Sequence, residues 1–343
     1  MTAEPLAARA ARYRPAVARE MRAVVGGAPD ALSGWLRYHL GWEDRAGRPV
    51  EGAGGKMLRP TALLLAHELS GGAVEQALPA AASVELIHNF SLLHDDIEDA
   101  SETRHGRPTL WTFAGPAQAI NAGDGMYTVA RLALYRLIDA GVPAARALAA
   151  MHELDRACLR LVQGQALDIA FEGQTNVTRD EYLDMAAGKT AAMFAAPFAI
   201  GALLADAAPA VVDGFRRFGH AVGIAFQAVD DVLGIWGDPA VTGKPVGDDL
   251  RTRKMTLPVT TALEAGGELA ERLRDAYATP PAPGEDIAPL ARLIERGGGR
   301  VATEALARER LAAGLEALRA AGLHADALRP CAEFAEAAVG RVA

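Results

Sequence analysis

Apolar residues recur at intervals of three and four along most of the chain, the spacing that places them on one side of an α-helix. The segment 305–322, ALARERLAAGLEALRAAG, shows this spacing, with charged residues between the apolar positions. Alternating runs of β-branched residues, the pattern of half-buried strands, are nearly absent. The sequence therefore predicts an all-α protein.

Clusters of glycine and proline interrupt the helical pattern and divide it into about ten helices of ordinary length. They lie at residues 26–29, 52–55, 71–72, 106–116, 172–176, 237–247 and 279–284. The stretch 278–286, ATPPAPGED, is expected to be a surface loop, with helical sequence on both sides. We therefore expect residues 1–343 to form a single all-α domain.

One segment, residues 191–212, is apolar enough to raise the question of a membrane span. It contains Pro197, Asp206 and Pro209 and is rich in alanine rather than leucine, which favours buried helices over a transmembrane helix. The N-terminal residues carry charges every few positions and lack the apolar core of a signal peptide. We expect no transmembrane segment.

Composition narrows the class of protein further. The chain has 343 residues, half of them apolar, which is enough for a sizeable core. Its net charge of −8 argues against a nucleic-acid-binding protein. Its two cysteines, Cys158 and Cys331, form neither a disulfide framework nor a CxxC pair, so a reducing, cytoplasmic location is the expectation.

Two clusters of acidic residues stand in otherwise apolar helical sequence. The first is DDIED, from Asp95 to Asp99, at the end of a predicted helix over 78–100, and the second is Asp230–Asp231 in a predicted helix over 224–235. Burying like charges costs several kcal/mol per ion unless cations neutralise them. Asp95 and Asp99 share one helix face, about 6 Å apart. Carboxylates at this spacing suit Mg²⁺, which is commonly completed by waters and substrate phosphates.

A solvated acidic helix end is the alternative interpretation of the first cluster. Its context argues against this alternative, because Leu92, Leu93 and Ile97 make the helix mostly buried and the basic residues Arg104, His105 and Arg107 follow at once. Cations just beyond an acidic pair are typical of a phosphate site with its metals.

Further polar residues could bind a phosphate group, although each alone is more often a surface residue. Gln227 lies three positions before Asp230, so it shares that helix face and can donate to an anion. The Walker A, HExxH and GxSxG patterns are absent, so the sequence does not predict a P-loop, that type of zinc site or a nucleophile elbow. The basic residues are Lys56, Arg59, Lys189, Lys244, Arg251, Arg253 and Lys254.

Six segments taken together resemble the trans-isoprenyl diphosphate synthases of the polyprenyl synthetase family. The resemblance runs from about residue 50 to 260. It implies an all-α bundle around a deep cavity, usually in a homodimer, that joins an allylic diphosphate to isopentenyl diphosphate and releases pyrophosphate. The segments are GGKMLRP, HDDIED with RHGRPT, GQALDIA, KTAAMF, FQAVDDVLG, and GKPVGDDL with KMTLP.

The resemblance also implies a role for each matching residue. Asp95, Asp99 and Asp230 would hold the Mg²⁺ ions, three of them with substrate bound. Isopentenyl diphosphate would be bound by Lys56, Arg59 and His88. The allylic diphosphate would be bound by Arg104, Lys189, Thr190, Gln227, Lys244 and Lys254, and among these Lys189 and Lys244 join the three aspartates as catalytic residues.

Two positions depart from the family pattern. The second cluster ends at Gly234 instead of a third aspartate, so we expect metal binding there by two carboxylates, Asp230 and Asp231. His105 stands where the family has a second arginine that helps bind isopentenyl diphosphate. Because histidine ordinarily titrates near pH 6.5, we expect condensation to weaken above about pH 7. The alternative is that Lys56, Arg59 and His88 suffice and His105 only packs.

Residues one turn before the first cluster are expected to set the length of the product. Phe90 and Ser91 lie five and four positions before Asp95, on the helix face that would line the cavity. An aromatic residue followed by a small one at these positions resembles the pattern of geranylgeranyl diphosphate synthases in the family. A C20 product is therefore predicted, and a C15 product is the next candidate. Phe90 as an ordinary core residue is the alternative.

Two other functions share the same resemblance. Because Gly234 and His105 depart from the family pattern, a terpene synthase of this fold is the first rival. Such an enzyme ionises an allylic diphosphate without this condensation. A non-catalytic partner subunit is the second rival, and the intact first cluster argues against it, because such subunits tend to lose these aspartates.

Overall fold

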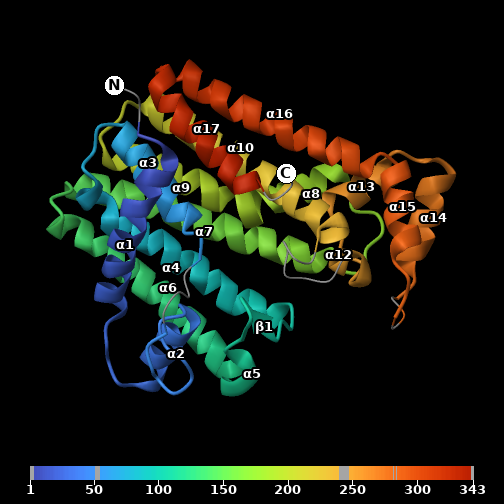
Figure 1. Ribbon diagram of the computed structural model, residues 1–343, viewed down its shortest axis with the longest axis horizontal. Helices are drawn as coiled ribbons and strands as arrows, with labels where there is room; N and C mark the ends of the chain where they lie inside the picture. Colours follow the sequence, from blue (N-terminus) through green and yellow to red (C-terminus); the bar gives the residue numbers. More distant parts are fainter. Residues whose placement is uncertain (1–3, 51–54, 239–246, 281, 283, 341–343) are drawn as a thin grey trace. The chain divides into compact units, whose positions relative to one another are not determined.

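The computed structural model describes residues 4–50, 55–238, 247–280, 282 and 284–340, and within them the chain is almost entirely helical (Figure 1). Its strands are two short segments that form one hairpin. The all-α prediction is therefore confirmed. The helices are more numerous than the ten predicted, because the regions 179–204 and 248–296 each divide into several short elements.

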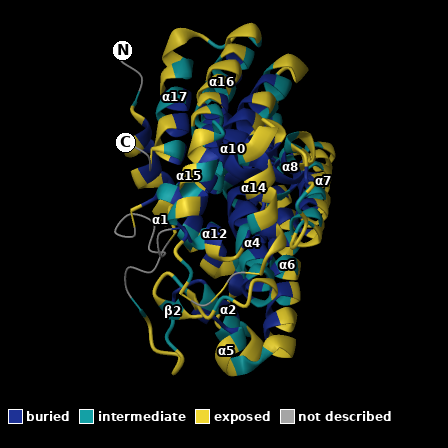
Figure 2. Cartoon of the chain, turned by 90° about the vertical axis from the view of Figure 1, so that its right-hand side faces the viewer, coloured by how far each residue is buried: buried dark blue, intermediate teal, exposed yellow. Residues whose placement is uncertain are grey.

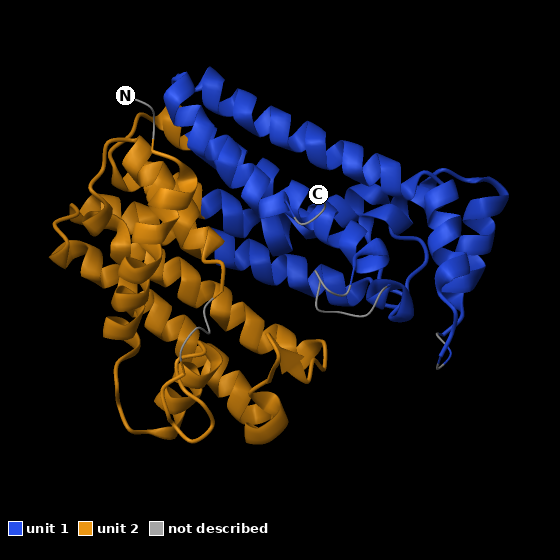
Figure 3. Ribbon diagram, in the orientation of Figure 1, with its two compact units in different colours: residues 1–3, 156–196, 213–343 blue, residues 4–155, 197–212 orange. Residues whose placement is uncertain are grey.

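Contacts divide the chain into two compact units (Figure 3). Residues 4–155 and 197–212 form what we call the N-terminal unit, and residues 156–196 and 213–343 form the C-terminal unit. The chain passes from one unit to the other after residues 155, 196 and 212. Each of these points lies inside a helix, namely α7 (Ala144–Ala170), α9 (Ala192–Leu204) and α10 (Pro209–Trp236). The organisation of residues 1–343 as one domain stays a prediction.

The N-terminal unit is built around a buried central helix, α4. Along most of its length α4 has no exposed face, and it packs against α6, α3 and α1. This explains why the sequence before the first acidic cluster is apolar on every side rather than on one stripe. The elements are α1 (Leu6–Val25), α2 (Ala31–His39), α3 (Leu58–Leu69), α4 (Val74–Glu98), β1 (Thr103–Arg104), β2 (Arg107–Pro108), α5 (Trp111–Ala114) and α6 (Pro116–Asp139).

In the C-terminal unit α13 packs against α8, α14, α15 and α16. The predicted periodic segment 305–322 coincides with α16 up to Ala320, and exposed residues separate most of the buried positions of this helix (Figure 2). The buried residues are Gly299, Thr303, Leu306, Ala307, Gly314 and Leu318. The elements are α8 (Arg179–Ala186), the π-helical turn η1 (Ala187–Ala191), α12 (Asp248–Arg251), α13 (Leu257–Glu264), α14 (Gly267–Ala278), α15 (Ala288–Arg296), α16 (Gly299–Ala320) and α17 (Ala325–Val339).

The apolar segment near residue 191 belongs to a continuous helical stretch, Arg179–Leu204, that is long and apolar enough to cross a membrane. Of its most apolar window, 72% is buried inside the protein, as in the core helix of a globular protein. The other described helices do not meet the same criteria.

Candidate active site

The carboxylates of the first acidic cluster, at the end of α4, differ in burial. Asp96 is 2% exposed and accepts a hydrogen bond of 2.7 Å from Nε of Arg104. Burial raises the pKa of Asp96, against the opposing effect of Arg104. Asp95 is half-buried and Asp99 is exposed. Asp96 is therefore held by the protein, whereas Asp95 and Asp99 reach the surface one turn apart.

The hairpin after α4 explains why Arg104 can reach back to that helix. β1 and β2 pair antiparallel, with Arg104 opposite Arg107. The two residues between them, His105 and Gly106, have φ angles of 51° and 72°, which is the left-handed conformation that a two-residue type I′ turn needs. Glycine adopts it freely, and histidine does so more readily than most residues.

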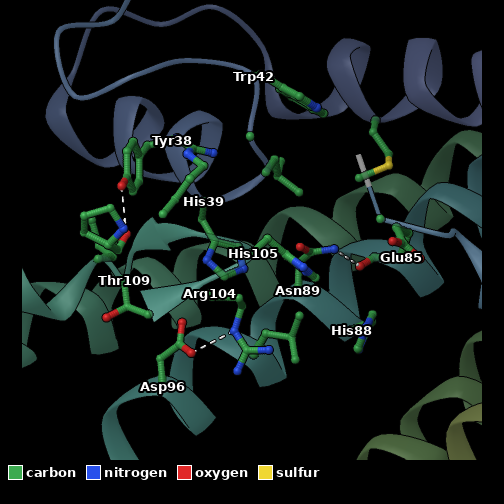
Figure 4. Close-up of a pocket in the computed structure, with 18 of the residues that line it drawn as sticks. Tyr38, His39, Trp42, Glu85, His88, Asn89, Asp96, Arg104, His105 and Thr109 are labelled. Carbon is green, nitrogen blue, oxygen red and sulfur yellow. Dashed lines mark hydrogen bonds and ion pairs between the residues drawn. The ribbon is translucent and has the colours of Figure 1, made fainter. Parts of the chain in front are cut away.

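A cavity of about 410 Å³ lies beside this hairpin in the N-terminal unit (Figure 4). Three histidines, His39, His88 and His105, and the arginines Arg104 and Arg107 line it. Burial lowers the pKa of His39 to about 3, and the two arginines add to the effect. Burial likewise lowers the pKa of His88 well below its ordinary value. His39 and His88 are therefore neutral near pH 7, and the arginines supply the positive charge.

A buried acid and a half-buried arginine interact on the neighbouring helices α4 and α3. Glu85 on α4 is 6% exposed and lines the cavity, and Arg59 lies in the first turn of α3. Burial raises the pKa of Glu85 to about 7, against the opposing effect of Arg59. Burial lowers the pKa of Arg59 to about 10, against the attraction of Glu85 and Asp95. Lys56, just before α3, is exposed.

In the second acidic cluster, on α10, only one aspartate faces solvent. Asp230 is exposed, whereas Asp231 is 4% exposed. Asp231 accepts three hydrogen bonds, from the Tyr182 hydroxyl (2.5 Å), the Leu257 backbone N–H (2.9 Å) and Nε2 of Gln227 (2.9 Å). The oxygens of Asp231 are therefore committed to these donors, whereas the Asp230 side chain faces solvent.

Gly234, the departure from the family pattern, lies against another aspartate. A Cβ atom on Gly234 would stand 1.9 Å from Oδ2 and 2.6 Å from Cγ of Asp249, far inside van der Waals contact. The Asp249 side chain, from α12, therefore occupies the space next to α10 that a larger residue at position 234 would need. Because side-chain atoms rather than backbone fill this space, a larger residue at position 234 would have to displace the Asp249 carboxylate.

Predicted ligands of the allylic diphosphate gather around the π-helical turn η1 in the C-terminal unit. The Thr190 hydroxyl donates to Oε1 of Gln227 (2.6 Å), and the Gln227 amide donates to Asp231. Lys189 and Lys254 both reach one oxygen of Asp168, with Nζ–Oδ2 distances of 2.5 and 3.4 Å. A π-helical turn inside a helix is often associated with a functional site.

The two residues predicted to set product length lie in α4, one turn before Asp95. Phe90 makes edge contacts with the rings of His94 (centroids 5.0 Å apart) and Tyr127 on α6 (5.3 Å). Ser91 is buried and its hydroxyl donates to the His88 carbonyl. Phe90 is half-buried, and α6 holds it through Tyr127.

The predicted site residues thus form two sets, each described within its own unit. Lys244 lies outside the described residues. The N-terminal unit holds Lys56, Arg59, His88, Phe90, Ser91, Asp95, Asp99, Arg104 and His105. The C-terminal unit holds Lys189, Thr190, Gln227, Asp230 and Lys254.

The carboxylates that reach the surface fit Mg²⁺ as it is bound with a diphosphate. Within the described part of the chain, no group of three or more His, Cys, Asp or Glu side chains is gathered around one point. A magnesium ion shared with phosphate groups needs only one or two protein carboxylates, because water and phosphate oxygens complete its six ligands. Asp95 and Asp99 in the N-terminal unit, and Asp230 in the C-terminal unit, each offer hard oxygen donors of that kind.

Sequence reasoning missed several residues that the structure brings to these sites. Asp168 lies within GQALDIA, one of the six quoted segments, yet its charge alone did not distinguish it from the other acidic residues. Glu85 is a lone acid in an apolar helix, a signal that could have been used. Tyr182 and His39 carry no local signal, because their roles depend on partners distant in sequence.

Comparison with known proteins gives a consistent result. The polyprenyl synthetase profile matches residues 44–294. Two relatives from Mycobacterium tuberculosis (strain H37Rv) are each 45% identical to this chain. A (2E,6E)-farnesyl diphosphate synthase aligns over 307 residues, 88% of this chain and 83% of the relative. A geranylgeranyl diphosphate synthase aligns over 290 residues, 84% of this chain and 82% of the relative.

Solved structures agree with the sequence relatives. The polyprenyl synthetase from Streptomyces coelicolor A3(2) superimposes with a TM-score of 0.90 at 39% identity, covering 97% of this chain and 99% of the other. The geranylgeranyl pyrophosphate synthase from Corynebacterium glutamicum, complexed with isoprenyl diphosphate and magnesium, gives 0.81 at 29% identity, covering 97% and 98%. The fold is therefore the all-α isoprenoid synthase type. Its sequence, its fold and its relatives together place this chain in the polyprenyl synthetase family, as a prenyltransferase.

Proposed function

We propose that this protein catalyses the Mg²⁺-dependent head-to-tail condensation of an allylic diphosphate with isopentenyl diphosphate, and that its product is geranylgeranyl diphosphate (C20). The observation that carries the proposal is the division of each acidic cluster into a buried, protein-bound aspartate and a carboxylate at the surface. Asp96 and Asp231 are buried, while Asp95 is half-buried and Asp99 and Asp230 are exposed. The magnesium in the Corynebacterium glutamicum complex supports the choice of metal.

The chemistry begins with loss of pyrophosphate from the allylic substrate. Mg²⁺, when bound, would supply charge that neutralises this leaving group. Lys189 and Lys254 add fixed positive charge at the allylic diphosphate, which stabilises the transition state more than the ground state; Arg104, in the N-terminal unit, is a further proposed ligand of this substrate. The isopentenyl double bond then attacks the allylic carbocation, and the departing pyrophosphate takes the proton whose loss forms the new double bond. No serine, cysteine or histidine nucleophile is needed.

The second substrate has a separate set of ligands in the N-terminal unit. Lys56 and Arg59 supply the positive charge for the isopentenyl diphosphate. His88, neutral near pH 7, serves as a hydrogen-bonding partner rather than a cation. His105, at the tip of the hairpin turn, adds charge only when it is protonated. The alternative, in which His105 only packs, predicts no effect of its protonation on binding.

The C20 product rests on Phe90, whose ring would end the space open to the growing chain. Its contacts with His94 and Tyr127 hold the ring between α4 and α6. Farnesyl diphosphate is the second candidate product, since one of the two relatives at 45% identity carries that name.

A homodimer in the cytoplasm is the proposed working form. On α6, Leu132, Tyr135 and Ile138 are 53, 61 and 49% exposed, at a three-residue spacing that forms one apolar stripe. Contiguous exposed apolar surface of this kind marks an interface, and a second copy of the chain is the partner. Tyr135→Glu should shift sedimentation from dimer to monomer. Val301→Glu, at an equally exposed position on α16, should not, and an unchanged dimer in both variants would place the interface elsewhere.

Incubation with radiolabelled isopentenyl diphosphate and a primer distinguishes the rival activities. The purified chain alone, given dimethylallyl, geranyl or farnesyl diphosphate and Mg²⁺, should transfer label into a longer diphosphate. A terpene synthase would instead release pyrophosphate without incorporating label. A non-catalytic subunit would do neither.

A further inference from the structure

A buried carboxylate in the C-terminal unit connects two lysines that sequence analysis assigned separately. Asp168 lies near the end of α7, and its side chain is 10% exposed. Its Oδ2 atom is 2.5 Å from Nζ of Lys189 and 3.4 Å from Nζ of Lys254. The two ammonium groups, 65 residues apart in the chain, therefore meet at one oxygen.

The local packing makes this meeting point well defined. Gly164, one turn before Asp168, has no room for a side chain, since a Cβ there would stand 2.1 Å from the backbone nitrogen of Lys189. Gly188 is equally restricted, with the Arg160 carbonyl oxygen 2.7 Å from its Cβ position. The two glycines let α7 and η1 touch backbone to backbone, so Lys189 starts close to the helix that carries Asp168.

Lys254 is brought to the same point by a loop that is itself anchored. The preceding residue, Arg253, has a φ angle of 54° and donates to both carboxylate oxygens of Glu285 at 2.7 Å. The Lys254 backbone N–H donates to the carbonyl of Asp249. Backbone contacts therefore hold the main chain at Lys254 in place, and its ammonium group pairs with Asp168.

The electrostatics of the group require the carboxylate. Two ammonium groups so close together would each lower the other's affinity for a proton. Asp168 stays ionised, because Lys254 and Lys189 lower its pKa more than burial raises it. Tyr182 on α8 is also within the electrostatic influence of Asp168, and its hydroxyl is committed to Asp231. The Asp168 carboxylate therefore offsets one of the two ammonium charges.

We propose that Asp168 is a positioning residue for the allylic diphosphate: it holds Lys189 and Lys254 side by side, so that both can bind the leaving pyrophosphate. The inference rests on the proposed function, which places these two lysines at the allylic diphosphate. The Oδ2 atom of Asp168 faces the two lysines, so Asp168 acts through them. Its contribution is to the charge and orientation of the two donors.

The test is the binding of inorganic pyrophosphate with Mg²⁺, measured by calorimetry from pH 7 to 10, together with steady-state kinetics. Wild-type binding of pyrophosphate should be lost only at alkaline pH, since lysine ordinarily titrates at about 10.4. We call this loss of binding the alkaline fall. Asp168→Asn should weaken binding about tenfold and move the alkaline fall downward by about one pH unit, because the lysines then repel each other without a neutralising charge. The KM for the allylic diphosphate should rise more than kcat falls.

Three further variants separate positioning from folding. Asp168→Glu should restore most of the binding, because the charge returns. Lys254→Gln in the Asp168→Asn background should move the alkaline fall back toward the wild-type position, because only one lysine remains. Asp184→Asn is the matched control, since Asp184 pairs with Arg160 at 2.8 Å in the same unit and is 62% exposed, and it should change neither quantity.

The outcomes distinguish the inference from the function on which it rests. A lowered melting temperature in Asp168→Asn with an unmoved alkaline fall would show a purely structural role and overturn the inference. Wild-type protein that binds no pyrophosphate and makes no condensation product would contradict the proposed function instead.

Discussion

Adjacent aspartates in both clusters lie in opposite environments, and helix geometry is the reason. Consecutive helical residues point about 100° apart, so one carboxylate of a DD pair faces the core when its neighbour faces solvent. In α4 the core-facing residue is Asp96, paired with Arg104, and in α10 it is Asp231, which accepts three hydrogen bonds. Each pair therefore combines a structural carboxylate with one that can bind a metal.

Matched substitutions in α10 should separate these two roles. Asp231→Asn leaves buried donors without an acceptor and should lower the free energy of unfolding by about 2 kcal/mol or more. Asp230→Asn should leave that free energy nearly unchanged but reduce turnover and weaken Mg²⁺ dependence. Urea denaturation and steady-state assays of both variants provide the comparison. Equal loss of stability in the two variants would contradict the division of roles.

Position 234 should not accept the aspartate that the family pattern has there. Gly234→Asp, and even Gly234→Ala, drives a Cβ atom into the Asp249 carboxylate, so turnover should fall about tenfold or more through displacement of that side chain. Combining Gly234→Ala with Asp249→Ala removes the clash. The double variant should therefore lose no more activity than Asp249→Ala alone, and strict additivity of the two losses would show that the clash is not the cause.

The KM for isopentenyl diphosphate should rise roughly two- to fivefold between pH 6.5 and 8.5. Burial raises the pKa of Glu85 to about 7, so Glu85 is neutral below that pH and adds a negative charge beside Arg59 above it. His39 and His88 are already neutral over this range. Glu85→Gln should therefore flatten the profile. A flat wild-type profile would exclude a role for Glu85.

At the scale of secondary-structure elements, the long helices could be predicted from periodicity and the short irregular elements could not. The predicted helix over 78–100 corresponds to α4 at 74–98, and that over 224–235 to the end of α10. The hairpin β1–β2 is only two residues per strand, too short for an alternating pattern, and η1 differs from an α-helix by its hydrogen bonds alone. Lys189 and Arg104 lie on these two elements, so their partners, Asp168 and Asp96, could not be predicted.

The contact between α4 and α6 should control product length. Phe90→Ala removes the ring that would close the space behind Asp95 and should shift products beyond C20. Tyr127→Ala removes the ring that holds Phe90 from α6 and should cause a smaller shift in the same direction. Chromatography of the dephosphorylated products measures both. Ser91→Ala, on the same turn of α4, keeps a small side chain at the second predicted position and should leave product length unchanged. An unchanged length distribution in Phe90→Ala would make Phe90 an ordinary core residue.

At the scale of the whole molecule, the sequence motifs are distributed over both compact units. Carboxylates for the metal and cations for the diphosphates occur in each unit, so neither unit alone contains the full set of proposed ligands. The family could be predicted from six short segments because each carries charges that the chemistry needs. Product length could not be predicted as firmly, since it depends on apolar contacts such as that between Phe90 and Tyr127.

The measurement that tests this account most directly is one incubation of the wild-type protein with farnesyl diphosphate and radiolabelled isopentenyl diphosphate, with and without Mg²⁺, followed by separation of the products by chain length. The account predicts a single labelled C20 product that disappears when a chelator removes the metal and returns when Mg²⁺ is restored. Pyrophosphate release without label in any prenyl product would contradict condensation, and labelled products mainly longer than C20 would contradict the role of Phe90.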